Sequence, residues 1–196
     1  SLDERIETFI KISKYLGSDR VIWRYDPVII TERYTLEWHK KAFNYISSKL
    51  SGHTESCVFS YLDMYDKISN NMRSINIQSI DANLMKSIAV SLNEIAKTKN
   101  IRMKTCSEEI DLNEVCIEHS CCIDPVLISK MIGCNLRSKK DPNQRSSCGC
   151  VESIDIGQYN TCQHGCKYCY ANYSLQSVVS NIKKHDPLSP MLLGNI

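Results

Sequence analysis

The sequence predicts an α/β fold, a partial (β/α) barrel-like parallel sheet followed by a cysteine-rich C-terminal segment. Two observations lead to this prediction. Over residues 1–134, amphipathic helical stretches alternate three times with short strands, and such alternation indicates a parallel sheet with right-handed crossovers. Ten of the 11 cysteines then follow residue 100. We therefore expect two parts, a βα-repeat over residues 1–134 and a cysteine-rich segment over residues 135–196.

The helices are predicted from apolar residues that recur three and four positions apart. We expect them at Leu2–Leu16, ending at Gly17, at 35–50 with Thr35 as its cap, at 81–97, and at 125–132 with proline at its start. Strands rich in β-branched and aromatic residues are expected at 20–25, 57–62 and 101–106. Asp26-Pro27 is expected to end the first strand, and residues 63–80 read as a polar loop.

Three strands are too few to close a barrel. A chain that opens on a helix instead resembles the C-terminal half of a (β/α) barrel, so we expect this sequence to be a fragment of a longer protein. The alternative is an open sheet whose exposed edge is completed by a partner, which predicts a dimer through that edge.

The strongest chemical signal is the C-x3-C-x2-C spacing of Cys162, Cys166 and Cys169. Three thiolates this close can hold one face of a 4Fe-4S cluster and leave one iron open for chemistry. The alternative is a zinc knuckle, with His164 or another cysteine as the fourth ligand, because zinc also binds cysteine and histidine at short spacings.

A second group begins with Cys148 and Cys150, where the intervening Gly149 lets both sulfurs turn toward one ion. Two more ligands are needed for a second cluster, and Cys122 and Cys106 are favoured because each stands beside a predicted element. The other candidates are Cys116, Cys121 and Cys134, of which Cys134 is the reserve choice. The ordinary alternative for an isolated cysteine is that of a small buried hydrophobic residue.

The motif Asn160-Thr161-Cys162, with His164-Gly165-Cys166 and Tyr168-Cys169-Tyr170-Ala171, resembles the signature of radical S-adenosylmethionine (SAM) proteins, most of all the spore photoproduct lyase branch. The resemblance implies that Cys162, Cys166 and Cys169 hold the cluster and that Tyr168 lies at its edge. It also implies that the open iron binds SAM and that the reduced cluster cleaves it.

A wider resemblance covers essentially the whole chain. The segments 21–27, 60–63, 106–111, 122–125 and 148–153 together resemble a bacterial family called domain of unknown function 1848. Its members carry a C-terminal cysteine cluster similar to that of radical SAM proteins, and longer relatives have additional N-terminal sequence. In radical SAM proteins the cysteine motif precedes the barrel, whereas here it follows the strands. SAM would therefore have to bind to strands upstream of the motif.

Polar residues that follow the predicted strands are the candidate catalytic groups, because chemistry in barrels takes place at the carboxyl ends of strands. They are Arg24, Asp26, Asp63, Glu108 and Glu109. The acids can relay protons or bind a nucleotide ribose, and the alternative is that they are solvated turn residues. We expect Trp23 to pack against a helix.

Net charge, cysteine count and the lengths of apolar runs limit which partners and which location we expect. A net charge of +2 gives no footprint for nucleic acid, so such a partner is not expected. The odd cysteine count, the absence of a signal peptide and the lack of a long apolar run favour a cytoplasmic protein that does not cross a membrane. We expect an iron-sulfur enzyme of radical SAM type, supplied with electrons by a reductant. The alternative is a non-catalytic iron-sulfur or zinc protein with a structural, sensing or electron-transfer role.

Overall fold

The structure, a computed structural model, describes residues 1–194 and separates into two compact units. The first unit contains residues 1–62 and 77–153, and the second contains residues 63–76 and those from Ile154 onward. Each unit is described by itself below.

A four-stranded parallel sheet forms the centre of the first unit. Its strands are β1 (Trp23–Val28), β2 (Ser56–Tyr61), β3 (Arg102–Cys106) and β4 (Glu118–Ser120), and they lie in the order β1-β2-β3-β4. The predicted α/β architecture with a parallel sheet is therefore confirmed. Because neighbouring strands follow one another along the chain and crossovers are right-handed, the connecting helices belong on one face of the sheet, as in a barrel wall.

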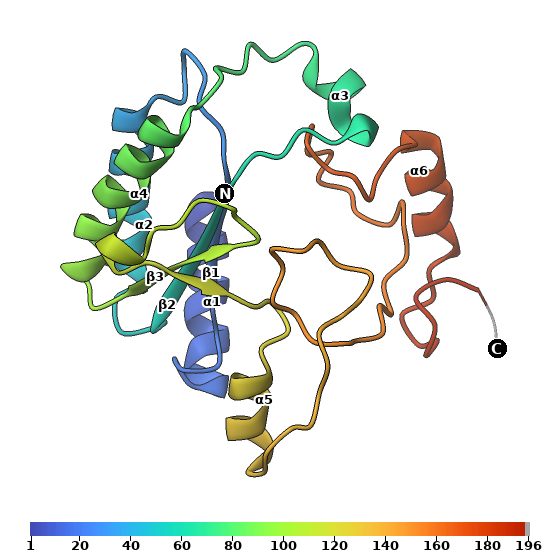
Figure 1. Cartoon of the computed structure of the whole chain (residues 1–196). Helices are drawn as coiled ribbons and strands as arrows, with labels where there is room; N and C mark the ends of the chain where they lie inside the picture. Colours follow the sequence, from blue (N-terminus) through green and yellow to red (C-terminus); the bar gives the residue numbers. More distant parts are fainter. Residues whose placement is uncertain (195–196) are drawn as a thin grey trace. The chain divides into compact units, whose positions relative to one another are not determined.

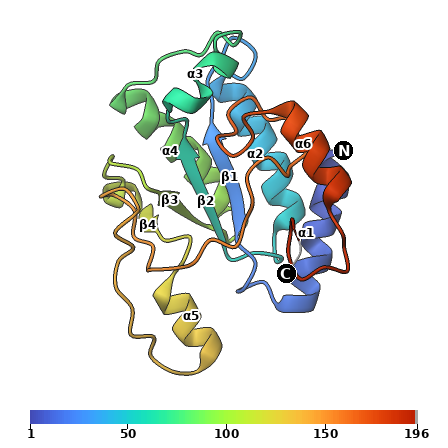
Figure 2. The ribbon, with the colours of Figure 1, turned by 90° about the vertical axis from the view of Figure 1, so that its right-hand side faces the viewer.

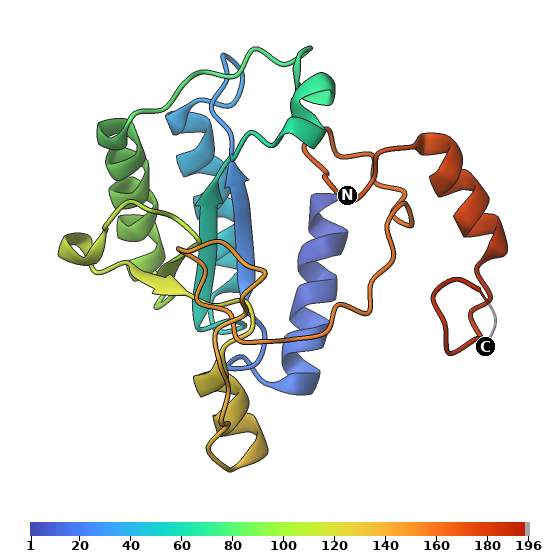
Figure 3. The same ribbon diagram turned by 45° about the vertical axis from the view of Figure 1, so that its right-hand side comes forward.

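The helices α2 (Leu36–Leu50) and α4 (Ala82–Lys97) connect these strands and lie together on one side of them (Figure 1). Thr35 and Asp81 cap the two helices by accepting hydrogen bonds from the backbone N–H of Trp38 and Leu84. The helix α1 (Leu2–Leu16) lies on the β1 side of the sheet in both Figure 2 and Figure 3. These helix boundaries agree with the predicted ones to within one residue.

The apolar core lies between the sheet and these helices. Strand register places Trp23, Cys57 and Met103 side by side, and likewise Tyr25, Phe59 and Thr105. The core side chains that are fully inaccessible to solvent come from both layers and include Phe43, Phe59, Ile88 and Leu92. Trp23 stacks on Phe43 with ring centroids 4.7 Å apart, so the expected packing of Trp23 against a helix is confirmed.

The first strand differs from its prediction. It does not end at Asp26-Pro27 but runs through this dipeptide to Val28, with a register irregularity between Tyr25 and Val28. The strand tolerates proline because β1 is an edge strand, where one side of the backbone needs no partner in the ladder.

Several short elements were not predicted. They are β4, the 3-10 turn η1 (Asn113–Val115), α3 (Asp66–Met72) within the expected polar loop, and α6 (Leu175–Lys184). The predicted helix at 125–132 is present as α5 (Pro125–Ile132). Strand β4 contains only three residues, which is too short for an alternation pattern to show.

The second unit combines α3 with the C-terminal part of the chain. Ile68, Met72 and Val178 are its buried apolar side chains. The ring centroids of Tyr65 and Tyr170 lie 6.3 Å apart, so the residue that precedes α3 contacts one that follows the cysteine motif. Within residues 1–194, no helix combines the length and the apolar character that a membrane crossing requires.

Candidate thiol sites

The three cysteines of the C-x3-C-x2-C motif lie on one loop of the second unit, residues 160–174, which we call the motif loop. Cys162 and Cys166 are exposed and Cys169 is half-buried. Their sulfurs take part in none of the hydrogen bonds described for residues 1–194. The Cys169 N–H donates a 3.1 Å hydrogen bond to the Cys166 carbonyl, which links two of the motif cysteines through their backbone. The thiols are therefore accessible to a ligand.

Asn160 closes the motif loop. Its side-chain Oδ1 accepts hydrogen bonds from the backbone N–H of Tyr173 at 3.0 Å and of Ser174 at 3.2 Å, and its own N–H donates to the Ala171 carbonyl at 2.9 Å. Asn181 from α6 donates to the Asn160 carbonyl. Asn160 is 5 % exposed, so this network is shielded from water and fixes the two ends of the loop together.

The glycine within the motif has a structural role. Gly165 lies in the left-handed region with φ of 63°, between Cys162 and Cys166. A side chain there would have to adopt a conformation that L residues rarely take. Asn172 additionally donates a 2.5 Å hydrogen bond to the Cys162 carbonyl, which holds the first cysteine against the end of the loop.

The second predicted cysteine group lies in the first unit, at the carboxyl end of β3. Cys106 ends that strand, and its Sγ is 3.4 Å from the Sγ of Cys122. The Sγ of Cys150 accepts hydrogen bonds from the backbone N–H of Cys122 at 3.2 Å and of Ile123 at 3.4 Å. Through Cys122, the structure thus connects Cys106 and Cys150, which are 44 positions apart in the sequence.

The other cysteines divide into two kinds. Cys121 belongs with this group, because a Cβ atom placed on Gly149 would lie only 2.7 Å from the Cys121 sulfur. The turn between Cys148 and Cys150 therefore passes close to Cys121, and a side chain at position 149 would require the Cys121 sulfur to move. Cys116 and Cys134 are exposed and share no described hydrogen bond with the group. Cys57 is a buried core residue, and burial raises its pKa well above the ordinary thiol value.

Arg24 places a positive charge beside this second cysteine group. Its Nη1 donates to Cys122 Sγ at 3.0 Å, while its Nε donates to Asp26 Oδ2 at 3.1 Å and its Nη2 forms an ion pair with the same carboxylate. A hydrogen bond from the Cys122 thiol lowers the pKa of Cys106 to about 6, and Arg24 acts in the same direction. The pKa of Cys122 is raised because its proton is held by the Cys106 thiolate.

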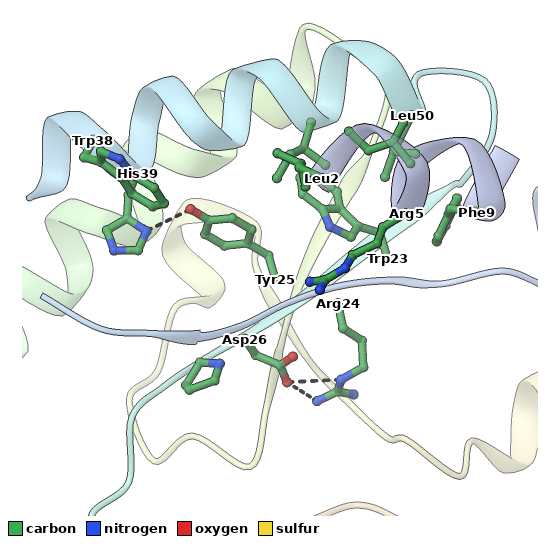
Figure 4. A pocket seen from close by; sticks show the side chains of 13 residues that line it. Leu2, Arg5, Phe9, Trp23, Arg24, Tyr25, Asp26, Trp38, His39 and Leu50 are labelled. Atoms are coloured by element: carbon green, nitrogen blue, oxygen red, sulfur yellow. Dashed lines mark hydrogen bonds and ion pairs between the residues drawn. The ribbon is translucent and has the colours of Figure 1, made fainter. Parts of the chain in front are cut away.

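Figure 4 shows how β1 separates two environments. Trp23 and Tyr25 point toward the helices, whereas Arg24 and Asp26 lie on the other side of the strand. On the helix side there is a cavity of about 380 Å³, bordered by α1, β1 and α2. There Tyr25 Oη lies 2.8 Å from His39 Nδ1, and His39 Nε2 lies 3.0 Å from the Ile29 carbonyl. Burial lowers the pKa of His39.

The remaining candidate catalytic residues have more ordinary surroundings. Glu108 Oε1 accepts a 2.8 Å hydrogen bond from the Tyr61 N–H and so satisfies the last residue of β2. Glu109 is exposed, and Asp63 lies in the second unit before α3. The sequence did not predict the contact of Arg24 with a thiol, because a hydrogen bond across 98 positions leaves no local pattern.

The chemistry of both donor sets suits a metal that prefers sulfur, since thiolates select zinc and iron-sulfur clusters. Within residues 1–194, however, no set of three or more histidine, cysteine, aspartate or glutamate side chains is already arranged to hold a metal ion. The sulfurs of each group are accessible or adjacent, and they are not yet gathered around one point.

Comparison with known proteins gives one match. The model of the family described as domain of unknown function 1848 matches residues 1–171, which include all three cysteines of the C-x3-C-x2-C motif. Neither a curated protein nor a solved structure matches the chain. Because the match covers far more than half of the sequence, the chain belongs to the domain of unknown function 1848 family.

Proposed function

We propose that this protein is an iron-sulfur protein of radical SAM type, in which Cys162, Cys166 and Cys169 ligate a 4Fe-4S cluster. The observation that carries the proposal is the motif loop itself. Three thiols project from a loop whose ends are tied by Asn160, and those sulfurs are not used in the described hydrogen bonding. A loop closed by other groups keeps its thiols available for a cluster.

The number of thiols favours a catalytic cluster over an electron-transfer cluster. A cuboidal cluster has four irons, and three cysteines leave one iron to bind another molecule. When bound, such a cluster supplies one electron to the sulfonium of SAM, whose sulfur–carbon bond breaks to give methionine and a 5′-deoxyadenosyl radical. The proposal therefore requires an external reductant, and it leaves the substrate that the radical attacks to experiment.

The residues of the motif loop would then act on the cluster without ligating it. Gly165 allows the chain to turn tightly between the first two cysteines, and Asn172 fixes the backbone of Cys162. Loss of groups that orient metal ligands typically lowers metal affinity or activity by about 10- to 100-fold. Tyr168 and Tyr170 flank Cys169 and would cover the cluster edge.

The test is anaerobic reconstitution with iron and sulfide, followed by electron paramagnetic resonance of the reduced protein with and without SAM. We expect a 4Fe-4S signal that changes when SAM is added. Replacement of Cys162, Cys166 and Cys169 by alanine should remove the signal. The control Cys116→Ala/Cys134→Ala also removes exposed cysteines, but it should keep the signal because both lie outside the motif.

Two results would contradict the proposal in different ways. A 4Fe-4S signal that is indifferent to SAM would leave an iron-sulfur protein without the radical chemistry. Four-coordinate zinc bound by the motif cysteines after anaerobic purification would exclude the cluster altogether, because a closed zinc site has no open position.

A further inference from the structure

The part of the first unit that follows β4 has almost no apolar core. We call residues 121–153 the sheet-edge segment. Helix α5 within it has no buried residue, and the buried side chains of the whole segment are those of Asp141, Cys148, Cys150 and Val151. Segments that cannot bury enough apolar surface are usually held by disulfides or metals. Half of the buried side chains in this segment are cysteines.

The backbone of the segment nevertheless has a defined path. Asp141 N–H donates to the Cys150 carbonyl, Glu152 N–H donates to the Lys139 carbonyl, and Val151 N–H donates to the Ile123 carbonyl at 3.3 Å. These contacts place Cys150 beside Cys122 and Ile123. The few hydrogen bonds do not by themselves offset the loss of conformational entropy, which costs about 1–2 kcal/mol for each ordered residue.

The distance between Cys106 and Cys122 fits two ligands of a single ion. Two thiolates on one tetrahedral zinc lie about 3.8 Å apart when each zinc–sulfur bond is about 2.3 Å. The observed separation of the two Sγ atoms is 3.4 Å. Both cysteines are free in the structure, since the sulfurs of a disulfide would be about 2.05 Å apart. An iron-sulfur cluster places each cysteine on a different iron, which favours sulfurs that are farther apart.

The sulfur of Cys150 is held in a fixed position. Two backbone N–H groups, those of Cys122 and Ile123, donate to it, and the residue is buried. Cys148 is also buried and lies two residues earlier, across the glycine that passes against Cys121. The C-x-C turn is therefore held against residues 121–123 from both sides.

Arg24 balances the charge of such a centre. Zinc with four thiolates carries a net charge of −2, and removing that charge from water is costly unless a cation is near. The Arg24 guanidinium reaches Cys122 and is held in place by Asp26. A fixed guanidinium beside the sulfurs therefore lowers the cost of a negatively charged zinc–thiolate centre.

We propose that Cys106, Cys122, Cys148 and Cys150 bind one zinc ion, which fastens the sheet-edge segment to the carboxyl end of β3. Binding requires rotation of the cysteine side chains until the four sulfurs meet. Cys106 and Cys122 are already in contact, and Cys150 Sγ accepts a hydrogen bond from the Cys122 backbone. This site goes beyond the proposed iron-sulfur function, because it uses none of the motif cysteines and its role is structural.

The experiment begins with a chain in which Cys162, Cys166 and Cys169 are alanine, so that failure of the iron-sulfur proposal cannot influence the result. Purified with zinc in the medium, this chain should contain one zinc per molecule by elemental analysis. Adding Cys122→Ser and Cys150→Ser should reduce the zinc content by more than tenfold. The matched control Cys116→Ser/Cys134→Ser should retain one zinc.

A second measurement avoids the problem that a cysteine variant fails to fold. The unsubstituted chain is treated with N-ethylmaleimide with and without stoichiometric zinc, and the modified cysteines are identified by mass spectrometry. We expect zinc to slow modification of Cys106, Cys122, Cys148 and Cys150 at least tenfold and to leave Cys116 and Cys134 unchanged. Hydrogen exchange should slow across residues 121–153 at the same time.

Three outcomes would overturn the inference. The first is zinc that remains after the Cys122→Ser/Cys150→Ser change. The second is equal modification of the four cysteines with and without zinc. The third is an iron-sulfur cluster in the chain that lacks the motif cysteines, because the four sheet-edge thiols would then hold a different centre.

Discussion

The helix-covered face of the sheet and the sheet-edge segment belong to the same unit but bury opposite kinds of side chain. Between the sheet and its helices the buried residues are aromatic and aliphatic, such as Phe43, Phe59 and Leu92. In residues 121–153 they are two cysteines, an aspartate and a valine. Cysteines therefore make up half of the few side chains that the sheet-edge segment shields from solvent.

The largest expected effect breaks the hydrophobic side of this comparison. Phe43→Ala removes a ring with no exposed surface that stacks on Trp23 and meets Tyr25 edge-on, with ring centroids 5.1 Å apart. Loss of such a ring costs about 3–5 kcal/mol because a cavity remains. Urea unfolding followed by tryptophan fluorescence measures it. Tyr15→Ala, at an 89 % exposed position, is the control and should change stability by less than about 0.5 kcal/mol.

The next change concerns the polar network that closes the motif loop. Asn160→Ala leaves two backbone N–H groups without their acceptor, which costs about 1–3 kcal/mol in a buried site. Hydrogen exchange should therefore rise at Tyr173 and Ser174 and remain unchanged in α2 and α4. The comparison variant Asn172→Ala removes one hydrogen bond, to the Cys162 carbonyl, and should therefore raise exchange at Tyr173 and Ser174 less than Asn160→Ala does. Equal protection of the loop in Asn160→Ala and the unsubstituted chain would show that other contacts close it.

A pair of helix caps compares the two regions directly. Asp81 caps α4 and Asp124 caps α5, and replacing either by alanine costs about 1 kcal/mol. Because α4 is anchored by buried residues and α5 has none, Asp81→Ala should lower the global urea midpoint while α4 stays helical. Asp124→Ala should instead open α5 locally, which hydrogen exchange detects. Similar responses of the two helices would contradict the contrast between the regions.

The smallest expected effect is the pH dependence contributed by His39. Burial lowers the pKa of this histidine in the folded protein below its ordinary value of 6.5. As the pH falls below 6.5, the unfolded chain takes up a proton that folded His39 resists, so stability decreases. The urea midpoint should fall more between pH 7 and pH 5 in the unsubstituted chain than in His39→Gln. His53→Gln, in the turn after α2, is the control and should follow the unsubstituted chain.

The sequence predicted the fold where periodic patterns are long. The helices α1, α2 and α4 each span 15 or 16 residues with a clear apolar face, and they were predicted to within a residue. The short elements β4 and α3 were missed, because three or seven residues cannot establish a period. The extension of β1 through Pro27 depended on its position at the edge of the sheet, which the sequence does not reveal.

The candidate site was predictable in its residue types but not in its arrangement. The spacing of Cys148 and Cys150 suggested a shared ion, and Cys106 and Cys122 were the favoured partners. The structure brings Cys122 into contact with Cys106 and with Cys150, and it adds Arg24, whose contact with Cys122 depends on how β1 and β3 lie in the sheet. A two-residue alternation shows only that Arg24 faces away from Trp23 and Tyr25, not what it meets there.

The long separation between Arg24 and Cys122 has a consequence for how the protein is made. Ribosomes add about 5–20 residues per second, so Cys122 is synthesised roughly 5–20 s after Arg24. Strands β1 and β2 with α2 can pair during that interval. The ion pair of Arg24 with Asp26 joins residues two positions apart, so it can form on the nascent chain before Cys122 has been made.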